Sequence, residues 1–78
     1  MLTEDQQRKI RLLCQRQRIG MVEFLPNGRI QFSAFRPIRD LVAETFPAMR
    51  IVDDGVSSWQ SRPDEMKRGY WVIVEMEN

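Results

Sequence analysis

The chain has 78 residues, of which 42% are hydrophobic and 29% are charged, and its formal net charge at pH 7 is +1. This composition is typical of a globular protein, and the length predicts a single domain over residues 1–78 rather than a disordered segment. With no histidine and one cysteine, the sequence excludes Ser-His-Asp and Cys-His catalytic centres, internal disulfides and zinc sites built from Cys and His.

The charge is distributed unevenly along the chain. Residues 1–39 contain eight Lys or Arg and three acids, a net charge of +5, whereas residues 40–78 contain four bases and eight acids, a net charge of −4. A basic first half could bind phosphates or an acidic protein surface, or the two halves could simply pack against each other. Packing is the favoured interpretation, because the overall charge is far from that of a typical basic nucleic-acid-binding module.

The beginning of the chain does not resemble a secretory leader, because Met1-Leu2-Thr3-Glu4-Asp5 is acidic and no apolar segment follows it. No apolar run approaches the roughly 20 residues that a membrane-spanning helix needs. A lone cysteine also fits a reducing compartment. We therefore expect a cytoplasmic protein that does not insert into membranes.

The first expected element is a helix. Thr3 and Gln6 have the spacing of a capping box, and the two acids between them suit the positive end of a helix dipole. The pattern predicts a helix over about residues 4–18 that ends near Gly20.

This helix is predicted to be amphipathic. At 100° per residue, Ile10, Leu13 and Cys14 share one apolar face. A cysteine on such a face behaves as a small hydrophobic side chain, so we expect Cys14 to be buried and unreactive. The opposite side is polar and largely basic, and it carries Arg8, Arg11, Gln15 and Arg18.

A β-hairpin is predicted next, with strands over residues 21–25 and 29–35. The connecting Pro26-Asn27-Gly28 supplies the backbone angles of a three-residue loop, since Gly readily adopts a positive φ. In the second strand apolar and polar residues alternate, which predicts one buried and one solvated face. The residues expected on the buried face are Val22, Phe24, Ile30, Phe32 and Ala34.

A second helix is expected to begin at Pro37 and to end at Pro47, with apolar residues at helical spacing between them. Residues 49–52 are a candidate third strand, closed by a turn at Asp53-Asp54-Gly55. For residues 56–69 two interpretations remain open. Ser61-Arg62-Pro63-Asp64-Glu65 could start a short helix that Gly69 ends, or the whole segment could be a long loop.

The final expected strand, residues 70–76, is apolar on both faces. Tyr70, Val72 and Val74 would lie on one side, and Trp71 and Ile73 on the other. A strand of this kind must be covered on both sides. A chain of this length has little material to do so, which leaves one face for a partner.

Together these elements follow the order α-β-β-α-β-β. The order predicts an α+β fold: a small antiparallel sheet of three to four strands with two helices on one face. The other face of the last strand, which carries either Trp71 and Ile73 or Tyr70, Val72 and Val74, would then form an exposed apolar patch of the kind that marks interfaces.

No pattern in the sequence predicts a catalytic, metal or cofactor site. Asp53-Asp54-Gly55 and Asp64-Glu65 lack the alternating acids of a calcium loop, and turn or helix-start roles explain both pairs. The four glycines form no phosphate-binding loop. We therefore expect a protein that is not an enzyme, holds no cofactor or metal and has no small-molecule substrate.

The leading functional hypothesis is a non-catalytic interaction domain of adaptor or inhibitor type. It would bind a protein partner, or a second copy of itself as a homodimer, through its C-terminal strand, because Trp and Tyr dominate interface hot spots. The residues predicted to contact the partner are Trp59, Tyr70, Trp71 and Ile73.

The alternative is a small nucleic-acid-binding regulator that uses the basic first helix. The first helix and the hairpin that follows it supply the candidate phosphate-binding side chains, namely Arg8, Arg11, Arg18, Arg29 and Arg36.

Overall fold

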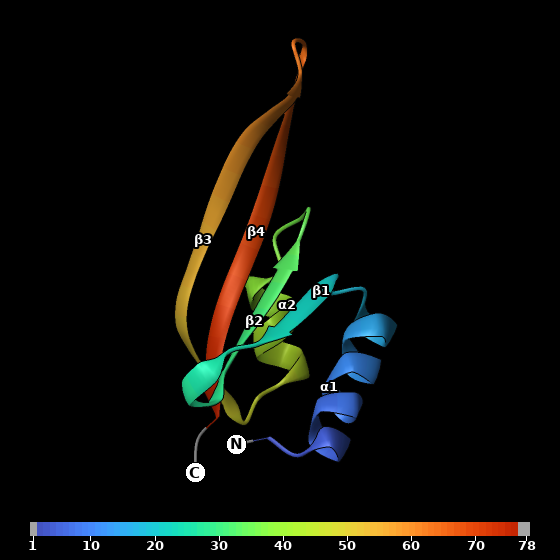
Figure 1. Ribbon diagram of the computed structural model, residues 1–78, viewed down its shortest axis with the longest axis vertical. Helices are drawn as coiled ribbons and strands as arrows, with labels where there is room; N and C mark the ends of the chain where they lie inside the picture. The colour runs from blue at the N-terminus through green and yellow to red at the C-terminus, as the bar shows by residue number, and fades with distance from the viewer. Residues whose placement is uncertain (1, 77–78) are drawn as a thin grey trace.

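The computed structural model describes residues 2–76, which form two α-helices and a four-stranded antiparallel sheet (Figure 1). The strands lie in the order β1-β2-β4-β3. The predicted α+β class and the order of the elements are therefore confirmed. No helix in this part of the chain is long and apolar enough to cross a membrane. The elements are α1 (Glu4–Gln17), β1 (Met21–Phe24), the 3-10 turn η1 (Pro26–Gly28), β2 (Arg29–Ala34), α2 (Arg39–Thr45), β3 (Met49–Arg62) and β4 (Glu65–Met76).

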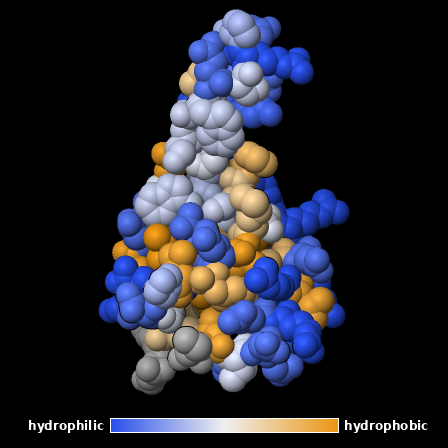
Figure 2. All heavy atoms as spheres, viewed as in Figure 1, coloured by the Kyte–Doolittle hydropathy of each residue, from blue (hydrophilic) through white to orange (hydrophobic). Residues whose placement is uncertain are grey.

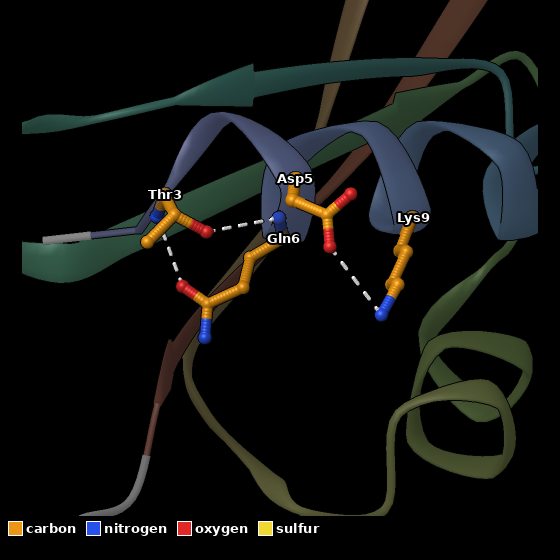
Figure 3. A network of polar contacts seen from close by, with 4 residues as sticks. All are labelled: Thr3, Asp5, Gln6 and Lys9. Atoms are coloured by element: carbon orange, nitrogen blue, oxygen red, sulfur yellow. Dashed lines mark hydrogen bonds and ion pairs between the residues drawn. The ribbon is translucent and has the colours of Figure 1, made fainter.

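Helix α1 begins at the predicted capping box (Figure 3). The Thr3 hydroxyl accepts a hydrogen bond from the Gln6 amide at 3.1 Å, and Gln6 Oε1 accepts one from the Thr3 amide at 2.9 Å. These two bonds satisfy donors that the first turn of a helix leaves free. One turn further on, the exposed pair Asp5–Lys9 (3.4 Å) adds a small i,i+4 stabilisation. The helix ends where Arg18 adopts a left-handed conformation, with φ of 55°.

The core lies between the two helices and one face of the sheet. Buried side chains from α1, α2, β2 and β4 belong to a single cluster, so both helices cover the same sheet face, as predicted. Leu13 is an exception to the prediction: it is 36% exposed and lies outside the cluster, because Ile10 and Cys14 make the contacts of α1 with the core. The buried residues are Ile10, Cys14, Ile19, Ile30, Phe32, Ile38, Val42, Phe46, Val72 and Val74.

The β1–β2 hairpin forms as predicted. Pro26 opens the turn, and Asn27 and Gly28 adopt positive φ angles of 68° and 74°. The Leu25 amide then donates to the Arg29 carbonyl at 2.8 Å, which closes the loop. The predicted alternation is also confirmed, since Ile30 and Phe32 are completely buried.

Helix α2 is shorter than predicted and begins at Arg39 instead of Pro37. Its buried residue, Val42, packs with the flanking Ile38 and Phe46 in the core. The Phe46 ring stacks on Phe32 with a centroid distance of 5.1 Å. This contact fixes the end of α2 against the middle of β2.

The main difference from the sequence-based prediction lies in residues 53–69. The predicted turn at residues 53–55 and the predicted helix or loop after it are both wrong, because β3 continues to Arg62 and turns directly into β4. Only Pro63 and Asp64 lie between the two strands. The resulting long hairpin projects beyond the other elements and gives the molecule dimensions of 45 × 23 × 22 Å (Figure 1).

We call the projecting part of this hairpin, residues 57–69, the arm. In β4, pairing with β2 ends at Tyr70, so within the described chain residues 65–69 are paired with β3 alone. A register shift between Ile51 and Asp53 interrupts the regular pairing of β3 with β4.

Candidate interaction surface

The side chains of β4 alternate between two faces as predicted, and the structure decides which face is open. Val72 and Val74 are buried beneath the helices, whereas Trp71 and Ile73 are partly exposed on the opposite, open face of the sheet. Successive side chains on a strand alternate between faces, so Tyr70 belongs to the face of Val72. The residues predicted to contact a partner therefore do not all point the same way. The side chain of Tyr70 lies on the opposite face of the sheet from those of Trp71 and Ile73.

Each tryptophan of the open face lies over a glycine of the neighbouring strand. A Cβ atom added to Gly55 would overlap the indole of Trp71, its register partner. A Cβ on Gly69 would lie 3.1 Å from Trp59 Cζ3. Aromatic rings that cover strand glycines are held flat against the sheet. Both indoles are thus positioned before any partner arrives.

A groove of about 540 Å³ lies on this face where the arm leaves the body; we call it the arm-base groove. Phe35 and Met21, at 75% and 70% exposure, are among its lining residues, together with Trp59, which is 41% exposed. The Phe35 and Trp59 ring centroids are 6.0 Å apart, within the range of an aromatic pair. In the space-filling view the arm tip is hydrophilic, and pale and apolar residues gather nearer the body (Figure 2).

The charged residues that line the groove, within the part of the chain that the structure describes, are Arg18 and Arg36. Arg36 Nη2 donates to the carbonyls of Arg18 (2.6 Å) and Gln17 (3.3 Å), at the negative end of the α1 dipole. This contact leaves Nε and Nη1 of the guanidinium as further donors. Lys67 is the register partner of Trp59, so its side chain lies on the same face of the arm.

The five arginines predicted to contact nucleic acid do not form one surface. Arg8 and Arg11 are exposed on α1, and Arg18 is exposed at its C-terminal cap. Arg11 was predicted to point away from the core, but its guanidinium carbon lies 4.9 Å from the centroid of the Phe24 ring in β1. Arg29 begins β2 and is the register partner of Glu75, while Arg36 caps α1.

Phe35 and Met21 are functional candidates that sequence reasoning did not identify. The sequence did contain a signal for Phe35. In the predicted strand it falls on the same solvated face as Gln31 and Ser33, yet its side chain is large and apolar. The structure places Met21 on the same face, in the edge strand β1, where it is the register partner of Ser33.

The acidic pairs take structural positions. Asp53 and Asp54 pair with Ile73 and Val72, so they lie on opposite faces of the sheet. Asp54 binds Arg39 at the start of α2, with 2.9 Å between Oδ2 and Nη1. Within residues 2–76, no three His, Cys, Asp or Glu side chains lie close enough together to hold a metal ion.

Cys14 is buried in the core, as predicted, with 2% of its surface exposed. Burial raises the pKa of its thiol to about 11, and the nearby Arg11 only partly offsets this. At pH 8 we expect iodoacetamide to alkylate native Cys14 more than about 100-fold more slowly than Cys14 of the chain unfolded in urea, because the thiolate is the nucleophile. Mass spectrometry of timed samples measures both rates. Equal rates would show that the thiol is accessible in the folded protein.

Comparisons with protein-family models, with curated proteins and with solved structures found no match to this chain.

Proposed function

We propose that this chain is a non-catalytic interaction domain that binds a protein partner through the open face of its sheet. The observation that carries the proposal is the gathering of Met21, Phe35, Trp59 and Trp71 around the arm-base groove. Apolar side chains that gather on one exposed surface, and are not scattered singly, are typical of interaction sites. Tryptophan and other aromatic side chains are also the residues that contribute most to binding at interfaces.

The rigidity of the surface supports the same function. Trp71 lies over Gly55 and Trp59 lies over Gly69, so their side chains would lose little conformational freedom when a partner binds. Affinity depends strongly on such preorganisation, because each side chain immobilised on binding costs about 0.5–1.5 kcal/mol.

A homodimer is one version of this proposal. The partner would then be a second copy that packs its own open face against the first, as expected for an isologous interface. Light scattering during size-exclusion chromatography, at several protein concentrations, distinguishes a homodimer from a monomer that awaits a different partner.

The alternative, nucleic-acid binding through α1, has weaker support. Binding of this kind depends mainly on several phosphate contacts made together. The candidate arginines are spread over different surfaces, and Arg11 and Arg36 already contact Phe24 and the end of α1. We therefore favour a protein partner.

The test uses one substitution in the groove and one outside it. Phe35→Ser removes an exposed groove side chain, and Val56→Ser removes one of 55% exposure from the opposite face of the same sheet. We expect the wild-type chain and the Val56→Ser variant to capture the same protein from an extract of the native cells, and Phe35→Ser to lose it by more than about tenfold. The captured protein is then purified and its affinity for all three chains is measured by calorimetry.

Circular dichroism first establishes that both variants are folded. Retention of the same protein by Phe35→Ser would show that the open face is not a binding surface. So would the absence of any specifically captured protein together with a monomer in the light-scattering measurement.

A further inference from the structure

The arm offers something that an ordinary apolar surface lacks, namely a strand edge without a partner. Pairing between β2 and β4 ends at Ala34 and Tyr70, while β4 continues back to Glu65 along the arm. Within the described residues, the backbone of 65–69 on the side away from β3 has no strand to pair with. An open edge of this kind is a template for an added strand.

The arm-base groove lies at the same place. Its lining includes Gly69 and Tyr70 of β4 and, at the end of β2, Phe35 and Arg36. A chain added along 65–69 would therefore continue the line of β2, and every second side chain would point into the groove. The groove's volume of about 540 Å³ lies within the range of ordinary ligand pockets.

The charged residues that line the groove are of one sign. Arg18 and Arg36 line it, and among the described residues no acid does. Lys67 lies on the same face of the arm. Acids on the same sheet face lie outside the lining: Glu23 is the register partner of the lining residue Gln31, and Glu65 is already within 3.9 Å of Arg62 Nε. A ligand that bears carboxylates would complement the positive charge of the groove lining, whereas a basic ligand would be repelled by it.

We propose that the arm-base groove binds an extended acidic segment of a protein partner, which adds as a strand along residues 65–69 of β4. Alternate apolar side chains of the segment contact Trp59 and Phe35, and a carboxylate contacts Arg18 and Arg36. This proposal rests on the proposed function and identifies the partner's chemistry. Three basic side chains are few for a nucleic acid, whose binding depends on many phosphate contacts, so a peptide fits the site better.

The experiment selects peptides from a random 12-residue library displayed on phage, using the immobilised full-length chain. We expect the enriched peptides to combine alternating apolar residues with Asp or Glu. The synthetic consensus peptide is then titrated against wild type and against two charge reversals, one at the residue that ends α1 and one within the helix. Arg18→Glu, in the groove, should weaken binding at least about tenfold, and Arg8→Glu, outside it, less than about twofold.

A compensating change in the peptide tests whether its acids contact Arg18 directly. The same peptide with its acids replaced by lysine should bind Arg18→Glu more tightly than it binds the wild-type chain. Equal losses in the Arg8→Glu and Arg18→Glu variants would reflect net charge alone and would overturn the proposal.

Three further results would also overturn it. The first is a selection without enrichment of acidic residues, or with no enrichment at all. The second is a fluorescent (dT)15 strand that binds in a Phe35-dependent way and more tightly than the best peptide, which would identify the ligand as nucleic acid. The third is a dimer abolished by Phe35→Ser, which would identify the occupant as a second copy of this chain.

Failure of this inference is distinguishable from failure of the proposed function. If Phe35→Ser loses the captured protein while the library shows no acidic preference, the open face remains a binding surface and only the chemistry assigned to its ligand is wrong.

Discussion

Replacing Gly20 with alanine is expected to lower the free energy of unfolding by about 3 kcal/mol. Gly20 connects α1 to β1 with φ of 97°, a conformation that residues with a Cβ rarely adopt. A Cβ there would also overlap the Ser33 carbonyl oxygen and lie 3.2 Å from the Ala34 Cβ. Backbone cannot move aside as a flexible side chain can, so the strain of the conformation and the steric overlap add. Urea unfolding followed by tryptophan fluorescence measures the loss.

Gly28→Ala is the matched control. Gly28 also has a positive φ, of 74°, but a Cβ there would meet no atom within 4 Å. Only the conformational cost remains, and we expect a loss of about 1 kcal/mol. Equal losses for the two variants would contradict the steric argument. The comparison also concerns the candidate site, because Gly20 lines the arm-base groove between the end of α1 and the end of β2.

Local signals account for the part of the fold that the sequence predicts well. The Thr3–Gln6 capping box and the loop at residues 26–28 need only neighbouring residues to form, and both are present in the structure. The alternation in β2 also predicts which residues are buried, because a one-residue shift would expose the whole apolar set.

The arm could not be predicted in the same way. Asp53, Asp54 and Gly55 are typical turn residues, yet in the structure Asp54 and Gly55 each contact a residue distant in the sequence. Arg39 neutralises Asp54, and the Trp71 ring covers Gly55. These long-range contacts override the local preference of the segment, as they commonly do in strands.

The candidate site was predicted in part. The two-sided apolar pattern of the last strand predicts that one of its faces stays open, but it does not say which one, and only the structure assigns Trp71 and Ile73 to the partly exposed face opposite the core. The groove itself depends on the arm, since it needs Trp59 from β3 beside Phe35 from the end of β2. The sequence predicts that the third strand ends at residue 52. Because Trp59 then lies outside the sheet, the sequence gives no reason to place its ring beside that of Phe35.

Phe32→Ala is expected to cost about 3–5 kcal/mol, the range for deleting a buried aromatic ring. Phe32 is completely buried, and its ring stacks on Phe46 between the sheet and α2. A chain of this size has a total stability of only about 4–12 kcal/mol. We therefore expect Phe32→Ala to be largely or wholly unfolded at 37 °C, with loss of its far-ultraviolet circular dichroism signal and of its cooperative thermal transition.

Phe35→Ala is the counterpart three positions along the same segment. Its ring is 75% exposed and touches Trp59 at the groove, so removing it should change the stability by less than about 1 kcal/mol. Binding of the partner, by contrast, should fall by at least about tenfold. If Phe35→Ala were as destabilised as Phe32→Ala, Phe35 would belong to the core, and the groove would be needed for folding. If stability and binding separate as expected, the two phenylalanines divide the sheet into a face that holds the fold together and a face that is free to bind.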